Sequence, residues 1–116
     1  MSGVEMKSFE SPDEVRSLDK TTVEILRFGA GSVGRFTVEP GWKWSEHISP
    51  KMGTPTRQAT HFGAVHSGHL HIVHEDGTSV DVGPGDTYTV AAGHDAWVIG
   101  DEPFVAFEFE AAENYI

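Results

Sequence analysis

The chain has 116 residues, of which 38% are hydrophobic, and its composition excludes several classes of protein. A chain of this length can bury one hydrophobic core, so we expect a single domain over residues 1–116. It has no cysteine, which excludes disulfides, thiolate nucleophiles and cysteine-held metal clusters and is typical of the reducing cytoplasm. Eighteen acidic residues against eight basic ones give a formal net charge of −10, which would repel nucleic acid and anionic membranes. No stretch approaches the roughly 20 apolar residues of a membrane span, so we expect a cytoplasmic protein without membrane or nucleic-acid partners.

The first structural signal along the chain is the sequence SPDE at residues 11–14. Ser11 can cap a helix, Pro12 suits a first helical turn, and Glu14 completes a capping box. The sequence therefore predicts one short N-terminal turn of helix.

From Thr22 onward the chain consists of short runs rich in Val, Ile, Phe, Tyr and Thr, separated by glycine and proline turns. Eight runs are predicted to be strands: TVEILRF, SVGRFTVEP, THFGAVH, HLHIVHE, TSVDVG, DTYTVAA, AWVIG and FVAFEFE. Many short strands with almost no helix predict an all-β sandwich or barrel. The first run, TVEILRF, would offer an apolar edge that a second copy could cover, so we expect a homodimer.

Alternation along the hairpin at Ser67 and Gly68 assigns two faces. Leu70 and Ile72 would point into the core, which places His69 and His71 on the outer face. We therefore expect these two histidines to form a surface cluster rather than a metal site.

The histidines fall where strands meet loops, in an arrangement that resembles the first motif of the cupin family. Gly41 is followed, after five residues, by His47, as the motif requires. The second histidine of the motif falls on Ser49, and the position of its glutamate, seven residues before Gly68, is occupied by His61.

The second cupin motif is matched by the GPGD to AAG segment. Gly85 is followed after five residues by Ala91 at the proline position and then by Gly93. The final histidine of the motif would fall on Ala96, whereas this chain has His94, which shares a strand face with residue 96. The resemblance implies a single cupin-type, jelly-roll-like β-barrel.

Several imidazoles pointing into a narrow barrel are costly to bury unless each has a partner, and one divalent cation would satisfy them together. We therefore predict a mononuclear metal site formed by His47, His61 and His94, with Gln58 as a candidate oxygen ligand or supporting donor. Three imidazoles suit Zn, Fe, Ni, Mn, Co or Cu, so the identity of the metal is left open.

Three further residues are candidates for handling a small-molecule substrate. Glu46 is the candidate acid or base, and Arg57 could clamp a carboxylate. Trp44 would share the face of Glu46 near the mouth of the pocket if that stretch is extended.

These features predict a metal-binding small cupin that acts as a metal-dependent enzyme on a small organic molecule. Two alternatives stay open, because a fold does not determine a function. One is a non-catalytic module that binds or senses a small ligand, and the other is a metal-free isomerase on the same barrel.

Overall fold

The structure is a computed structural model, and it describes residues 3–49 and 60–110 of the chain. Almost all of the regular structure in this part is β. In chain order the elements are β1 (Glu14–Leu18), β2 (Thr21–Phe28), β3 (Gly31–Val38), α1 (Trp44–His47), β4 (His61–Ser67), β5 (His69–His74), β6 (Ser79–Val82), β7 (Thr87–Val90), β8 (His94–Ile99) and β9 (Phe104–Glu110). All eight predicted strands are present, so the all-β prediction is confirmed.

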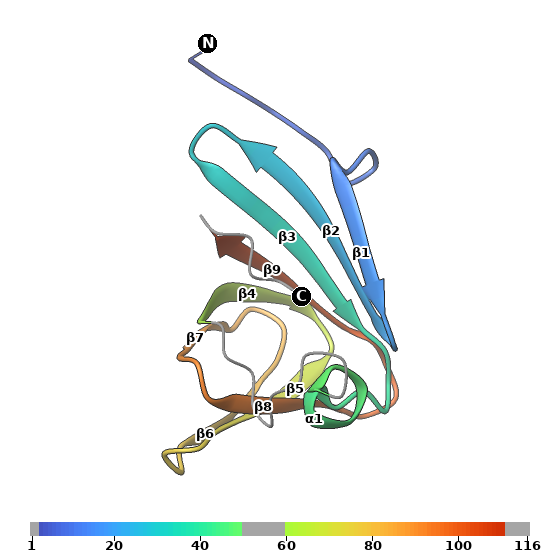
Figure 1. Ribbon diagram of the computed structural model, residues 1–116, viewed down its shortest axis with the longest axis vertical. Coiled ribbons are helices and arrows are strands. Elements are labelled where there is room, and N and C mark those ends of the chain that lie inside the picture. Colours follow the sequence, from blue (N-terminus) through green and yellow to red (C-terminus); the bar gives the residue numbers. More distant parts are fainter. Residues whose placement is uncertain (1–2, 50–59, 111–116) are drawn as a thin grey trace.

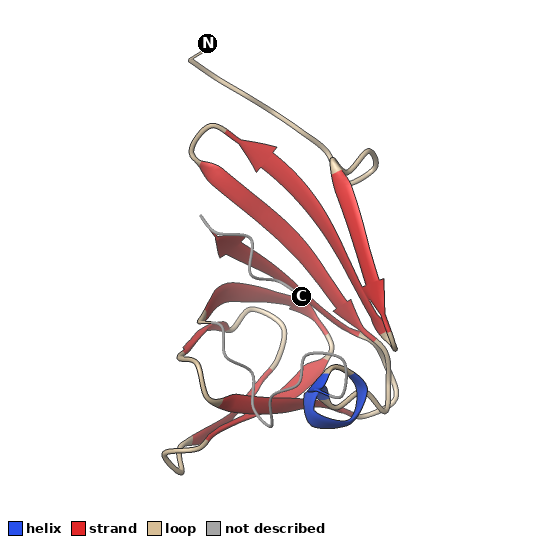
Figure 2. Ribbon diagram, in the orientation of Figure 1, coloured by secondary structure: helices blue, strands red, loops and turns tan. Residues whose placement is uncertain are grey.

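The strands form two antiparallel sheets that face each other (Figures 1 and 2). One sheet has six strands in the order β1-β2-β3-β9-β4-β7, and the other has three in the order β6-β5-β8. The predicted barrel is wrong in one respect, because the strands of residues 3–49 and 60–110 are not closed into a continuous hydrogen-bonded ring. The ladder ends at β7 on one sheet and at β6 on the other, and each of these edge strands has only four residues.

The N-terminal helical turn predicted for Ser11–Glu14 is absent from the described chain, since Glu14 begins β1. The backbone N–H of Asp13 donates to the carbonyl oxygen of Ile25 at 2.9 Å, and Glu14 is the register partner of Ile25. The backbone N–H that a helix cap would have satisfied is therefore hydrogen-bonded to β2 instead. Long-range strand pairing outweighs the local capping signal.

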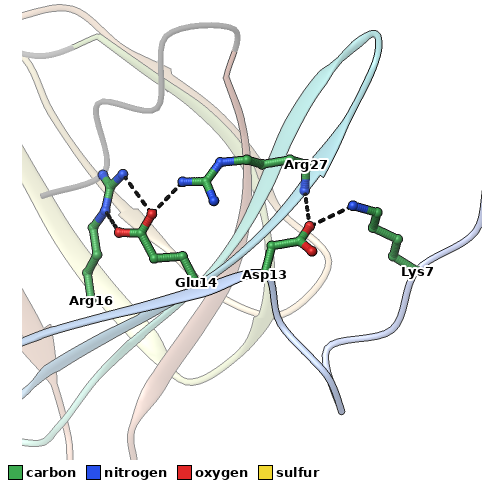
Figure 3. A network of polar contacts seen from close by, with 5 residues as sticks. All are labelled: Lys7, Asp13, Glu14, Arg16 and Arg27. Atoms are coloured by element: carbon green, nitrogen blue, oxygen red, sulfur yellow. Dashed lines mark hydrogen bonds and ion pairs between the residues drawn. The ribbon is translucent and has the colours of Figure 1, made fainter.

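Exposed ion pairs fasten this N-terminal strand (Figure 3). The Glu14 carboxylate accepts hydrogen bonds from Arg16 at 2.6 Å and from Arg27, while Asp13 accepts from Lys7 at 2.8 Å. The hydrogen bonds from Arg16 and then Arg27 lower the pKa of Glu14 to about 2. These contacts add to the backbone pairing of β1 with β2 and connect Lys7, in the segment before β1, to Asp13.

Because β1 is present, the run TVEILRF is not an edge strand. It forms β2 and lies between β1 and β3. The argument by which a homodimer was expected is therefore wrong, and the homodimer itself stays a prediction.

The core fills the space between the two sheets with inward-facing side chains. It contains Val23, Ile25, Phe36, Val38, Trp42, Trp44, Ile48, Val65, Leu70, Ile72, Val82, Tyr88, Ala96, Val98, Phe104 and Ala106. Leu70 and Ile72 are buried and His69 is exposed, which confirms the predicted faces of β5. Within the described residues, no helix is long and apolar enough to cross a membrane.

The chain passes from the first sheet to the second at Gly68, between β4 and β5. Gly68 has a φ of +77°, and a Cβ atom there would lie 2.3 Å from the carbonyl oxygen of Pro103. Only glycine meets both demands without strain. This tight turn lets β5 fold back so that the two sheets enclose a space between them.

Candidate functional site

A cavity lies in the core between the two sheets, and both sheets contribute to its walls. It offers about 30 Å³ of space for water-sized molecules. Most of its described walls are apolar, and four polar side chains, His61, Tyr88, His94 and Glu108, also contribute. The apolar lining consists of Phe36, Trp42, Trp44, Leu70, Ile72, Val90, Ala96 and Phe104.

Three of the polar side chains form a hydrogen-bonded chain in the six-stranded sheet. Nδ1 of His61, on β4, lies 2.7 Å from Oε1 of Glu108, on β9. The hydroxyl of Tyr88, on β7, donates to Oε2 of the same carboxylate at 2.5 Å. His61 and Glu108 are each only 4% exposed. A carboxylate this deeply buried requires such partners, and here it fixes the orientation of the imidazole.

His94, on β8, faces His61 from the other sheet. The two imidazole rings stand perpendicular to each other, with their centroids 5.5 Å apart. Nδ1 of His94 lies 2.8 Å from the carbonyl oxygen of Ala91. A carbonyl only accepts, so Nδ1 of His94 is the donor in this hydrogen bond.

The alternation of β9 explains how Glu108 reaches the cavity. Phe104, Ala106 and Glu108 are all buried, whereas Phe109 is exposed, so every second residue points inward. Gly63 on β4 faces this site, and a Cβ atom there would lie 2.6 Å from the carbonyl oxygen of Phe107 and 3.1 Å from the Tyr88 hydroxyl. The glycine therefore leaves the room in which the carboxylate and the phenol meet.

Trp42 and Trp44 reach the cavity from a segment that pairs with β8, since Lys43 forms an isolated antiparallel bridge with Trp97. The backbone N–H of Val98 donates to the carbonyl of Trp42, and the backbone N–H of Ser45 donates to the Asp95 carboxylate at 3.1 Å. Both indole Nε1 atoms are buried and have no hydrogen-bond partner among the described residues. The segment thus supplies two polar N–H groups to the region around a mostly apolar cavity.

Three of the predicted site residues, Trp44, Glu46 and His47, lie on the short helix α1, which turns their side chains in different directions. Because residues 44–47 are helical, Trp44 and Glu46 do not share a face: Trp44 is buried in the cavity wall, while Glu46 is exposed. Nδ1 of His47 lies 3.0 Å from the backbone nitrogen of Lys43, so that its ring turns back onto its own turn. His47 is not among the described residues that line the cavity.

The structure does not place two of the predicted residues. Arg57 and Gln58 lie in segment 50–59, outside the described residues. Their predicted roles in binding substrate and metal stay predictions.

The donor set fits a metal ion in part. Two predicted ligands, His61 and His94, line one cavity with their rings fixed through Nδ1. Within residues 3–49 and 60–110, however, no group of three or more His, Cys, Asp or Glu side chains is placed to hold a metal. The three-histidine site therefore stays a prediction, of which the structure brings two members together.

Sequence reasoning missed Glu108 and took Tyr88 only as a core aromatic. The signal for Glu108 was present in FVAFEFE, where this acid shares the parity of Phe104 and Ala106. An acid on the inward face of an alternating strand indicates a buried partner or a functional site.

No model of a known protein family matches the sequence, and no curated protein matches it. Solved structures share the fold. KdgF from Halomonas sp. has a TM-score of 0.63 at 16% sequence identity, over 95% of this chain and 94% of that one. A Klebsiella pneumoniae protein with a double-stranded β-helix domain has a TM-score of 0.60 at 18% identity, over 94% and 85% of the two chains.

A cupin-superfamily sugar phosphate isomerase from Silicibacter pomeroyi has a TM-score of 0.55 at 23% identity, and covers 78% of this chain. The match spans only 59% of the length of that isomerase. These similarities confirm the resemblance to cupin proteins at the level of the fold.

Proposed function

We propose that this chain holds one divalent metal ion in its cavity and acts as an enzyme on a small organic molecule. His61 and His94 are the proposed metal-binding residues. Gln58, water or the substrate itself would complete the coordination.

The observation that carries this proposal is how the two buried imidazoles are held. Nδ1 of His61 contacts the Glu108 carboxylate, and Nδ1 of His94 contacts the carbonyl of Ala91. Metal-binding histidines almost always donate one ring N–H to a carboxylate or backbone carbonyl, which orients the ring and presents the other nitrogen to the ion. Both cavity histidines have such a contact at Nδ1.

A bound ion with two protein nitrogens would keep open positions, and would polarise a substrate oxygen or lower the pKa of a coordinated water. The residues of the chain would do the rest. Glu108 and Tyr88 hold the His61 ring, and the apolar walls exclude bulk water from the reacting groups. Arg57 remains the proposed clamp for an anionic part of the substrate, and Glu46 the proposed acid or base if it approaches on binding.

A metal-free isomerase is the second candidate, and the chain from Tyr88 through Glu108 to His61 favours it. A carboxylate that accepts a hydrogen bond from the Nδ1–H keeps the electron pair of a neutral imidazole on Nε2, as a general base requires. The Silicibacter pomeroyi protein of similar fold is described as a sugar phosphate isomerase. A non-catalytic binding module, the third alternative, would hold the same small molecule and leave it unchanged.

Metal content measured on untagged protein tests the proposal. Protein stripped with a chelator and reloaded with Zn, Mn, Co, Ni, Cu or Fe(II) should retain about one ion per chain. His61→Gln and His94→Gln should each abolish tight retention, and Glu108→Gln should weaken affinity about 10–100-fold, because the partner that orients His61 is altered.

The matched control is the double variant His69→Gln, His71→Gln, which removes two imidazoles from the outer face of β5 and should leave metal content unchanged. A second variant pair tests geometry: His94→Ala should lose affinity, and adding Ala96→His should restore part of it, since both residues line the cavity from β8. Full retention in both His61→Gln and His94→Gln, with the fold intact by circular dichroism, would exclude the site and favour the isomerase or the binding module.

Two properties of the whole molecule are also proposed. A cytoplasmic location is supported by the absence of cysteine. A homodimer is supported by exposed apolar side chains on the outer face of the large sheet, where Phe62 and Phe109 contact each other and are 60% and 47% exposed. Light scattering after size exclusion tests the dimer, and a monomer at micromolar concentration would exclude it.

A further inference from the structure

The cavity is too small to enclose an organic ligand by itself. Its volume of about 30 Å³ holds roughly two water molecules, at about 10–15 Å³ for each. Any molecule larger than that which reaches His61 and His94 must extend past the cavity walls. Because the cavity is only partly enclosed, such a molecule can extend into a neighbouring space.

A groove adjoins the cavity and provides about 110 Å³. Ile72, Tyr88 and Val90 line both spaces, so the groove and the cavity share a wall. The other described residues of the groove are His74, Thr78, Ser79, Val80 and Thr89.

The groove lies where the two sheets do not join. β7 is the last strand of the six-stranded sheet and β6 is the last strand of the three-stranded sheet (Figure 1). Residues from both strands line the groove. Because β6 and β7 share no ladder of hydrogen bonds, the gap between them can open without breaking backbone pairing. Tyr88 is the residue that belongs to β7, to the groove and to the chain of hydrogen bonds that reaches His61.

The chemistry of the groove differs from that of the cavity. Its lining combines the hydroxyl-bearing residues Thr78, Ser79 and Thr89 with His74 and with apolar side chains such as Ile72 and Val80. The hydroxyl of Thr78 donates to Oδ1 of Asp76 at 2.7 Å. Within the described walls it has no lysine, arginine, aspartate or glutamate. Such a surface suits a neutral group that carries hydroxyl or carbonyl oxygens.

We propose that the groove between β6 and β7 is the entrance to the cavity and a second subsite for the ligand. It would hold the neutral, hydroxyl-bearing part of a small organic molecule whose other end reaches His61 and His94. This inference rests on the proposed function for its ligand, whereas the entrance itself can be tested without any ligand.

The absence of native cysteine allows a direct test of the entrance. Ala96 lines the cavity and is 6% exposed, so Ala96→Cys places a single thiol inside. The probe is methyl methanethiosulfonate, which transfers its methylthio group to the thiol and releases methanesulfinate. The rate of this reaction is measured by mass spectrometry under native conditions.

A tryptophan in the groove should close the entrance. In the Ala96→Cys background, Thr89→Trp should slow the reaction roughly tenfold or more, since only local unfolding would then expose the thiol. The matched control is Ser17→Trp, at an exposed position of the edge strand β1, which should leave the rate unchanged. If Ala96→Cys does not fold, Leu70→Cys supplies the thiol from another residue that lines the cavity but not the groove.

Reagents of increasing length test the subsite. Hydroxyethyl and longer hydroxyalkyl methanethiosulfonates should still react with the cavity thiol, because their tails can lie in the groove, and Thr89→Trp should block them more strongly than the methyl reagent. Equal rates with and without Thr89→Trp would overturn the entrance. Rejection of every reagent longer than methyl would overturn the subsite. Metal retention needs no groove, so either result would leave the proposed metal function to be judged on its own test.

Discussion

Two regions of the structure join carboxylates to hydrogen-bond donors, and they do so in opposite environments. At the N-terminal end, Glu14 joins Arg16 and Arg27 on the surface of β1 and β2. In the cavity, Glu108 joins His61 and Tyr88 where water is nearly excluded. The first group fastens a strand, whereas the second orients a side chain that can do chemistry.

The comparison shows how burial changes the contribution that the same kind of contact makes to the free energy of unfolding. Exposed ion pairs contribute little, because water and salt screen them and the long side chains must be ordered. A buried carboxylate that lacks its partners carries an uncompensated desolvation penalty. The loss of any one partner therefore lowers the free energy of unfolding by most of that penalty. Four predictions test this contrast, from the largest expected effect to the smallest.

Glu108→Leu should have the largest effect on stability. It removes the acceptor of His61 and of Tyr88, and breaking a buried pair on one side costs about 3–5 kcal/mol in the free energy of unfolding. The same change in the exposed network, Glu14→Leu, should have a much smaller effect. Urea unfolding followed by circular dichroism measures both, and similar losses in the two variants would contradict the contrast. Adding Tyr88→Phe to Glu108→Leu should recover part of the loss, because one buried donor disappears with its acceptor.

Gly63→Ala should come next. The added methyl group would lie 2.6 Å from the Phe107 carbonyl oxygen and 3.0 Å from Cγ of Glu108, so β4 and β9 would have to move apart. Such overpacking typically costs about 1–3 kcal/mol. Gly29→Ala is the matched control, since the nearest atom to its new methyl group lies at 3.7 Å, an ordinary contact. A Gly63→Ala variant as stable as Gly29→Ala would mean that the strands are not tightly packed there.

The contribution of Glu14 should depend on pH. Its folded-state pKa is about 2, below the ordinary value of 4.5, because Arg16 and Arg27 stabilise the charged form. A carboxylate whose pKa is lowered by folding contributes stability that is fully present when the pH is above its pKa in the unfolded state. This stability is lost as the pH falls toward its pKa in the folded state. The stability difference between the wild type and Glu14→Gln should therefore be constant above about pH 5 and vanish near about pH 2. A difference that stays constant over this range would show that the carboxylate charge is irrelevant.

Salt should produce the smallest effect and should separate the two regions. Raising the ionic strength toward about 1 M shortens the screening length to about 3 Å, which weakens exposed pairs such as Lys7 with Asp13. The stability loss caused by Glu14→Gln should shrink in high salt, while the loss caused by Glu108→Leu should persist. Equal salt dependence of the two losses would indicate that water reaches the cavity pair.

The fold could be predicted largely from local patterns, because strand alternation is a local property. The parity of Leu70 and Ile72 gave the correct faces of β5. The errors arose where a distant partner decided the outcome. Ser11 to Glu14 carried a helix-capping signal, but Ile25 of β2 supplied a strand partner instead.

The candidate site could be predicted only in part for the same reason. The resemblance to the cupin motif pointed to His61, and the strand parity of His94 with Ala96 pointed to His94. The structure places both in the wall of one cavity. His47 also matched its motif, but it lies on the four-residue helix α1. That helix has no side-chain hydrogen bond at its N-cap, so no capping signal in the sequence predicted it. Glu108 meets His61 only because β9 pairs with β4, a neighbourhood that no local pattern specifies.

The position of Trp42 and Trp44 has a practical consequence. Two of the three tryptophans in the chain line the cavity, and the third, Trp97, contacts the His71 ring on the small sheet. The protein therefore carries its own fluorophores at the place where a ligand would arrive. Indole emission responds to nearby charge and polarity, so a library of small molecules can be screened against the unlabelled protein, with Trp42→Phe and Trp44→Phe separating signals from inside and outside the cavity.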